Sequence, residues 1–221
     1  MRILYLFFVL FSFGILFLRA QSNSIPSDSI ATPFREGRWL TGLAGTISSN
    51  TNKTKSSDKK TITNEFGLNF STGKFIKERW LLGGRLNLNR ASSSNNVDRT
   101  TESLYVGPFS SYYLSKNNRG SLFTTLSMGY VRYREETSFN DLASPITEIA
   151  EGGGFGTLFG LGYSYVINDQ IAFDIGFDLN IFLVDISQEQ RPSGTTASEN
   201  LTVSNTAFTF GFNVILDDFF F

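Results

Sequence analysis

The strongest constraint on the fold is an alternation of apolar and polar residues that runs from Ile171 to Ile186. Its odd positions hold large apolar residues: Ile171, Phe173, Ile175, Phe177, Leu179, Ile181 and Leu183. The even positions between them hold small or polar residues: Ala172, Asp174, Gly176, Asp178 and Asn180. A period of two is typical of a β-strand with one apolar face, whereas on a helix the apolar set would surround the whole cylinder. We therefore predict a strand.

Similar segments recur along the chain, with polar stretches between them. There are eight, at approximately residues 38–48, 61–71, 80–90, 102–114, 121–134, 153–166, 170–186 and 201–217. Each reaches the ~9 to 11 residues that a tilted strand needs to cross a bilayer. The composition also favours an all-β chain, because 23 Phe, 8 Tyr and 20 Gly stand against only 5 Pro.

The connections between these segments alternate in length. Four are long and hydrophilic, at residues 48–60, 91–101, 134–150 and 187–200. Three are short, at residues 73–78, 115–120 and 167–170. Short turns at one end and long loops at the other are typical of an up-and-down transmembrane barrel. We predict an all-β fold, an eight-stranded antiparallel up-and-down transmembrane β-barrel.

In such a barrel the apolar face meets lipid and the polar face lines the lumen, since lipid offers no partner for backbone polar groups. The predicted polar network of the lumen consists of Glu65, Arg85, Asn87, Asp174, Asp178 and Asn180. Asp174 and Asp178 could instead form a catalytic pair, because some glycosidases use carboxylates at such separations. We favour an ion-pair network in which they meet Arg85, with Arg38 or Arg132 as further partners.

Two segments have an uncertain facing. Leu40 is out of phase in the first segment, and the fourth, around Leu104 to Leu114, is apolar or aromatic on both faces. Aromatic residues near the short turns are expected to form an interfacial girdle. They are Trp39, Trp80, Tyr112, Tyr163, Tyr165 and Phe221, and the opposite girdle is assigned to Tyr105, Tyr130 and Tyr133.

The amino terminus has the pattern of a secretory signal peptide. Arg2 precedes a largely apolar run, and the small residue Ala20 lies at the predicted cleavage site. The run is shorter than the ~20 residues of a membrane span, which disfavours an uncleaved anchor. We predict a signal peptide at residues 1–20, a polar leader at 21–35 and the barrel domain at 36–221.

Composition excludes several functions. The formal net charge of -1 gives no electrostatic case for a nucleic-acid partner. The chain contains neither histidine nor cysteine, which rules out histidine-based hydrolysis, disulfides and thiolate metal sites. We expect no enzymatic activity, no metal and no cofactor.

The most basic stretch lies in the first long connection. It contributes Lys53, Lys55, Lys59 and Lys60. In the simplest interpretation these lysines keep a solvated loop in water. The sharper hypothesis is that they contact the phosphates of lipopolysaccharide or an acidic partner.

At this level the chain resembles the small eight-stranded outer-membrane barrels of Gram-negative bacteria, the OmpA/OmpX-like group. The resemblance covers nearly all of the chain after the signal peptide. It is carried by a turn followed by an alternating strand at Gly73 to Leu88, by the Gly-Pro-Phe and paired-aromatic stretch at Val106 to Leu114, and by the terminal Phe221. The resemblance implies an outer-membrane location, surrounding lipid as a partner and recognition by the barrel-assembly machinery. We expect a monomer.

The expected function is that of a barrel whose lumen is filled by side chains and whose four loops serve envelope integrity or surface contact. Eight strands enclose an interior just wide enough for side chains to fill. Two alternatives remain. One is a narrow porin-like channel or carrier for small or hydrophobic solutes, and the other is a secreted soluble barrel with its faces reversed.

Overall fold

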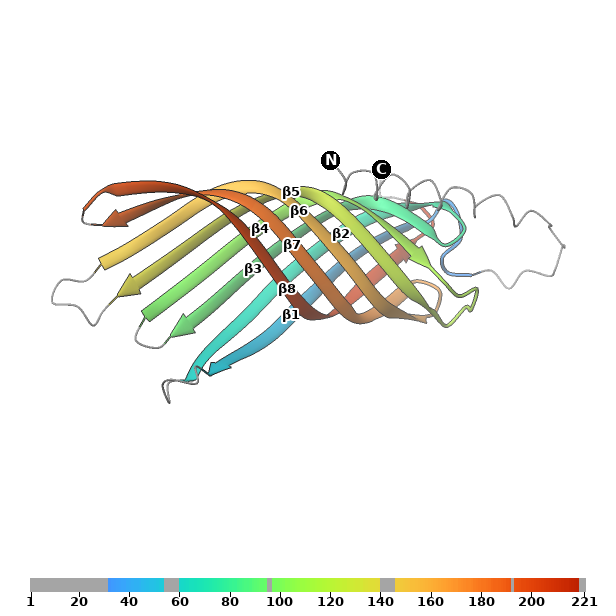
Figure 1. Cartoon of the computed structure of the whole chain (residues 1–221). Helices are drawn as coiled ribbons and strands as arrows, with labels where there is room; N and C mark the ends of the chain where they lie inside the picture. The colour runs from blue at the N-terminus through green and yellow to red at the C-terminus, as the bar shows by residue number, and fades with distance from the viewer. Residues whose placement is uncertain (1–31, 54–59, 95–96, 140–145, 192, 219–221) are drawn as a thin grey trace, which may run out of the picture. The chain divides into compact units, whose positions relative to one another are not determined.

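A computed structural model describes residues 32–53, 60–94, 97–139, 146–191 and 193–218. Within these ranges the regular elements are eight strands (Figure 1). They are β1 (Trp39–Lys53), β2 (Lys60–Lys77), β3 (Trp80–Ser94), β4 (Val97–Tyr113), β5 (Gly120–Phe139), β6 (Ile146–Ile167), β7 (Ile171–Arg191) and β8 (Thr195–Leu216). In the part of the chain that is described, no helix has the length and apolar character of a membrane span.

The strands form a closed ring in sequence order. Each strand pairs antiparallel with the next, and β1 pairs antiparallel with β8. The predicted fold class, an eight-stranded up-and-down barrel, is therefore confirmed. Each predicted segment overlaps one strand over more than half of the length of that strand.

Alternate residues of each strand face the outside of the barrel and its lumen. On β7 the residues from Ile171 to Leu183 at odd positions are exposed, and the even positions between them are turned inward. An outward belt of exposed apolar side chains continues on the other strands, for example at Leu43, Phe70, Leu86, Val106, Leu126, Phe159 and Phe210. We call this band the outer belt.

The ambiguous segments also have a definite facing. Leu40 is buried in the lumen, which explains why it is out of phase with the outward residues of β1. On β4 the odd residues Tyr105, Phe109 and Tyr113 are buried inside the barrel, whereas Val106 is exposed on the outside. The lumen is thus partly apolar, and both faces of β4 carry apolar residues for that reason.

The strands extend much further than predicted into the long hydrophilic connections. β5 and β6 pair from Gly120 and Tyr165 as far as Phe139 and Ile146. β7 and β8 pair out to Gln190 and Thr195, and Gly194 in their connection has a φ of 69°. Thr is favoured in strands, and the backbone pairing continues through the Ser and Asn residues between, so these connections are mostly long β-hairpins. We call this the hairpin end.

The predicted short turns all lie at the opposite end, which we call the short-turn end. Arg79 between β2 and β3 has a φ of 65°. Asn168 and Asp169 between β6 and β7 have φ values of 51° and 60°. Asn and Asp tolerate the left-handed region better than most residues, which suits them to this tight turn.

The seam that closes the ring is short. β1 and β8 pair from Trp39 opposite Leu216 to Ile47 opposite Phe208. Beyond Phe208, β8 continues toward the hairpin end in register with β7. The barrel is therefore closed at the level of the outer belt, and the β1–β2 and β7–β8 hairpins diverge beyond it (Figure 1).

Candidate functional site

An aromatic layer closes the lumen at the short-turn end. Phe34, from the segment that precedes β1, is fully buried and stacks on Tyr113 with 4.1 Å between the ring centroids. Phe75 is tilted against the same two rings at 6.0 Å and 5.6 Å. The layer is completed by Leu40, Leu81, Phe109, Val166, Ala172 and Ile215. We call this group the aromatic plug.

Ion pairs hold the segment that carries Phe34 against the barrel. Arg35 bonds to Asp169 at 3.0 Å and to Asp217 at 2.8 Å. Arg38, whose side chain is buried, lies 3.1 Å and 2.9 Å from the same two carboxylates. Two arginines thus share two carboxylates, one from the β6–β7 turn and one from the end of β8. The predicted polar leader is described only from Thr32 onward, and this part of it belongs to the plug.

A polar layer lies above the plug and contains the predicted lumen network. Arg85 of β3 and Asp178 of β7 form a buried ion pair across the lumen, with side chains 8% and 9% exposed. Separately, Asn180 donates to Asn205 at 2.7 Å, and Asn205 donates to Glu65 at 2.6 Å. Asn87 is buried on the same inward face of β3. The six predicted residues therefore face the lumen, but they form more than one group.

Asp174 does not join the ion pair of Asp178. It faces a small cavity of about 80 Å³, which Arg85 and Asn213 also line. The further partners proposed for the aspartates were wrong: Arg38 binds Asp169 and Asp217 at the short-turn end, and Arg132 is exposed on the outer face of β5. The alternation on β5 places Arg132 outward because the buried Val131 and Tyr133 flank it.

A second apolar layer fills the lumen above the polar one. It consists of Tyr105, Val131, Tyr133, Ala150, Leu158, Phe182, Val184 and Ile186. Gly156 makes this packing possible, since a Cβ there would lie 2.9 Å from the ring of Phe182 and 3.0 Å from that of Tyr105. A Cβ at Gly160 would likewise lie 2.7 Å from the carboxylate of Asp178. Gly156 and Gly160 of β6 thus leave room for large side chains from other strands.

A polar cluster covers this second layer at the hairpin end, beyond the outer belt. The carboxylate of Glu135 accepts hydrogen bonds from Tyr133 at 2.5 Å and from Arg99 at 2.6 Å. Burial, together with the bond to Glu135, raises the pKa of the Tyr133 hydroxyl to about 12. The same carboxylate also raises the pKa of Arg99.

The aromatic residues near the short turns lie on the outer face. Tyr112, Tyr163 and Tyr165 are exposed, and Trp39 and Trp80 are half-buried. The assignment of the opposite girdle was wrong for Tyr105 and Tyr133, because both are buried in the lumen; Tyr130 alone of the three is exposed there. Phe221, Lys55 and Lys59 lie outside the described residues, as does the predicted signal peptide, and Lys53 and Lys60 are placed only as the ends of β1 and β2.

Sequence reasoning missed the residue that seals the short-turn end. Phe34 lies in a stretch that is polar on average, and one aromatic residue gives no periodic signal. Its environment is set by Phe75, which lies in a predicted short turn, and by Tyr113, whose facing was ambiguous in the sequence. The available signal was the sequence Pro33-Phe34, an apolar pair directly before the first strand.

Comparisons with known proteins agree with this geometry. The sequence pattern of one family, described as outer membrane protein beta-barrel domain, matches residues 15–215. Among curated proteins, none has a sequence that matches this chain. The solved structure of OprG from Pseudomonas aeruginosa is 15% identical, with a TM-score of 0.57, over 84% of this chain and 99% of that one.

Two further structures are similar. A major outer membrane protein from Thermus thermophilus is 9% identical, with a TM-score of 0.51, over 81% of this chain and 99% of that one. Ail, the attachment invasion locus protein of Yersinia pestis, is 11% identical, with a TM-score of 0.47, over 82% of this chain and 99% of that one. At these identities the likeness concerns the fold alone.

Proposed function

Since this chain belongs to the outer membrane protein β-barrel domain family, we propose that it is a closed, non-enzymatic scaffold of the outer membrane. In this role the outer belt contacts lipid, and four long hairpins stand at the cell surface. Barrels of this kind place their short turns in the periplasm, which puts the hairpin end outside. The scaffold then serves envelope integrity or contact with other surfaces.

The filling of the lumen carries this proposal. The aromatic plug, the buried pair of Arg85 and Asp178 and the second apolar layer follow one another along the lumen. Within the polar layer the space that remains is a cavity of about 80 Å³. A cavity of this size holds a few water molecules and offers no continuous path for ions.

The arrangement of the carboxylates also supports a non-enzymatic role. Asp178 is neutralised by Arg85, and both Asp174 and Asp178 line the cavity of about 80 Å³. A general base must reach its substrate within hydrogen-bonding distance, and neither carboxylate opens onto a space that could hold a sugar or an acyl chain.

Conductance across a planar lipid bilayer tests the proposal. The reconstituted mature chain should leave the conductance at the level of a protein-free bilayer. A general porin inserted into the same bilayer is the positive control and should give steady openings. Steady openings from this chain would contradict the closed scaffold.

A second candidate function is a carrier of hydrophobic solutes, and the seam favours it. The pairing of β1 with β8 ends at Ile47 and Phe208. Beyond this point the partly buried Leu201 and Val203 of β8 pack against the second apolar layer. An apolar solute that parted these side chains would enter the lumen from the hairpin end.

Binding of an apolar fluorescent dye separates the two functions. Saturable binding to the purified protein that is lost in Val203→Asp would replace the scaffold with the carrier. Thr202→Asp is the matched control, because it changes the outward side of β8 at the next position and should leave lumen binding intact. The closed scaffold requires that no such binding occurs.

A further inference from the structure

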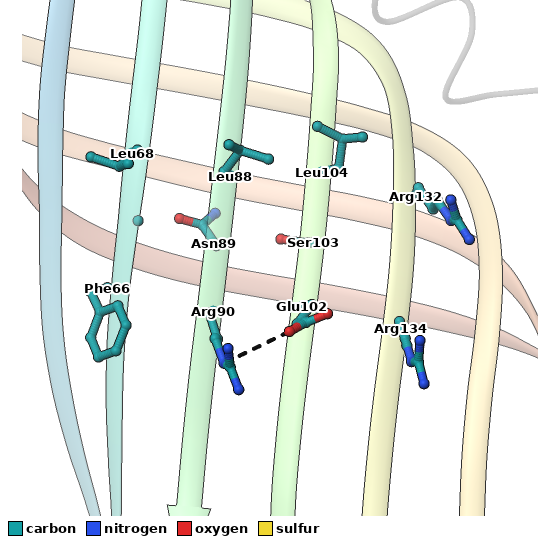
Figure 2. Close-up of a pocket in the computed structure, with 11 residues that line it drawn as sticks. Phe66, Leu68, Leu88, Asn89, Arg90, Glu102, Ser103, Leu104, Arg132 and Arg134 are labelled. Carbon is teal, nitrogen blue, oxygen red and sulfur yellow. Dashed lines mark ion pairs between the residues drawn. The ribbon is translucent and has the colours of Figure 1, made fainter.

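A hollow on the outer wall of the barrel lies across β2, β3, β4 and β5. Its volume is about 610 Å³ (Figure 2). The side chains that line it are Phe66, Leu68, Leu88, Arg90, Glu102, Leu104, Arg132 and Arg134, and the backbone of Gly67, Asn89 and Ser103 runs between them. We call this surface the outer-wall pocket.

Strand register arranges the lining in two rows. In the first row Leu68, Leu88 and Leu104 are direct cross-strand neighbours, and Arg132 follows Leu104 on β5. In the second row Phe66 is followed in the same way by Arg90, Glu102 and Arg134. Figure 2 shows the leucines at one level and the second row closer to the hairpin end. The pocket therefore changes from apolar to charged where the outer belt ends.

The apolar part of the pocket is available to lipid. Leu68 is 56% exposed, Leu88 45% and Leu104 36%. These leucines belong to the outer belt, so their neighbours in a membrane are acyl chains. A hollow across three strands at this depth has room for part of an acyl chain to lie against the wall.

Two arginines at the charged end of the pocket, Arg90 and Arg134, form only weak ion pairs. Arg90 is 3.7 Å from Glu102, and both side chains are at least half exposed. The guanidinium of Arg134 lies 3.7 Å from the carboxylate of Glu136 and 3.3 Å from that of Glu151. Exposed pairs of this kind contribute little to stability, so an anion can displace them at low cost.

Arg132 has an even more open environment. Its direct neighbours across the strands are Leu104 and Gly153, neither of which carries a charge. No ion pair involves Arg132 among the described residues. Its guanidinium lies beside Leu104 on the neighbouring strand and is free to donate a bidentate pair of hydrogen bonds to a phosphate.

Among the described residues, the outward arginines just beyond the belt lie on β3 and β5, in this sector of the wall. On β6 and β7 the outward positions just beyond the belt carry Glu151 and Asp185 instead. General attraction to an anionic membrane surface does not require one basic sector next to an acidic one. Three arginines and a row of leucines line the same hollow, and this combination points to the binding of a specific lipid.

We propose that the outer-wall pocket binds lipid A, the phosphorylated and acylated anchor of lipopolysaccharide in the outer leaflet. An acyl chain lies against the leucines, and a phosphate of the sugar headgroup accepts hydrogen bonds from Arg132, with Arg134 two residues further along β5 and Arg90 on β3 adding positive charge at the hairpin side of the pocket. This site differs from the lysine-rich connection of the sequence-based hypothesis. It rests on the outward facing of β2–β5 and holds whether or not the lumen conducts.

Native mass spectrometry of the whole mature protein in detergent tests the assignment. Purified bisphosphorylated lipid A should bind with one-to-one stoichiometry. Arg132→Gln should weaken binding about tenfold, as expected for loss of one charge-assisted bond, and Arg132→Gln with Arg134→Gln should weaken it further. Arg132→Gln is the decisive variant, since this residue has no ion pair among the described residues that its replacement would break.

Matched controls separate this site from general attraction. Arg191→Gln removes a charge from the hairpin end of β7, which does not line the pocket, and Arg119→Gln removes one from a short turn. Both should bind lipid A like the parent protein. Dephosphorylated lipid A and inorganic phosphate alone should each bind at least about tenfold more weakly than lipid A.

Three results would overturn the proposal. The first is unchanged binding by Arg132→Gln, once a heat-dependent gel shift has shown that the variant is folded. The second is equal loss of binding in Arg191→Gln. The third is equal binding of phosphatidylglycerol, which would make the pocket a general anionic-lipid surface.

Discussion

The ion pair of Arg85 and Asp178 is the interaction on which the polar layer depends most. Both side chains are buried, so water cannot solvate either charged group if its partner is removed. Asp178→Asn leaves the guanidinium without a counter-charge. We expect the free energy of unfolding to fall by about 3 kcal/mol, measured by urea unfolding in lipid vesicles.

Two comparisons sharpen this prediction. Arg85→Met with Asp178→Leu removes both charges and should recover most of the lost stability, because buried pairs often break even with apolar replacements. Arg191→Gln alters a pair at an exposed hairpin and should leave unfolding unchanged. An Asp178→Asn variant as stable as the parent would mean that the pair does not hold the lumen together.

Tyr133 predicts a loss of stability at high pH. The folded protein keeps the proton of this hydroxyl up to about pH 12, whereas the unfolded chain loses it at pH ~10. Between these values the unfolded state binds fewer protons, so the free energy of unfolding decreases as the pH rises. Tyr133→Phe should remove this part of the decrease.

The difference in stability between parent and Tyr133→Phe, followed from about pH 9 to about pH 12, isolates the effect from other titrating groups. Tyr130→Phe serves as the control because Tyr130 is exposed on the outer wall. Parallel curves for the parent and Tyr133→Phe would show that the Tyr133 hydroxyl is not protected by its environment.

At the scale of the element, β7 offers a depth series on one face. Phe177, Leu183 and Ser187 all point outward, and they run from the middle of the belt to the hairpin end. Phe177→Lys should destabilise the folded barrel by about 2 to 4 kcal/mol, and Ser187→Lys by less than about 1 kcal/mol. Leu183→Lys should fall between them.

Urea unfolding in vesicles measures the series, and membrane fractionation shows whether each variant is inserted. The inward Asn180 provides the opposite control, since Asn180→Lys disturbs the lumen without altering the lipid face. If Phe177→Lys cost no more than Ser187→Lys, the outward facing of β7 would be wrong.

The facing of an element could be predicted only where one face is consistently polar. β7 meets this condition, and its facing followed from the sequence. β4 does not, because Tyr105, Phe109 and Tyr113 fill an apolar lumen while Val106 faces outward. Burial inside a narrow barrel and contact with lipid both select apolar side chains, so hydrophobicity alone cannot separate them.

The extent of the strands was underestimated for a related reason. Beyond the outer belt both faces of a hairpin meet water, and the alternation that marks a strand disappears. Residues 187–200 therefore have the composition of a loop, although the chain pairs out to Gln190 and Thr195. Arg85 was predicted as the partner of both aspartates and pairs with Asp178 but not with Asp174, because contacts across the barrel depend on a register that one sequence does not reveal.

At the scale of the whole molecule, the pairing of β1 with β8 is the step that completes the barrel. Gly45 and Phe210 lie opposite each other in this seam. The natural chain has no cysteine, so Gly45→Cys with Phe210→Cys can form one defined disulfide within the chain. We expect that disulfide only in molecules that also show the heat-dependent gel shift of a folded barrel.

Non-reducing gels of samples taken during refolding into vesicles follow both signals. Gly45→Cys with Ile171→Cys is the control, because Ile171 pairs with Ile167 and Val214 and not with β1. A seam disulfide that forms well before the gel shift would indicate that β1 and β8 meet before the other strands are in place.

The short seam also implies an order in which the strands pair during folding. Every other pairing joins strands that are neighbours in sequence, so it can form as a local hairpin soon after its two strands are made. The seam joins the two ends of the barrel sequence, and its loop-closure entropy is the largest in the fold. β1 is the first strand to be synthesised and the last to be paired on both sides, so its open edge needs protection for as long as the rest of the barrel takes to arrive.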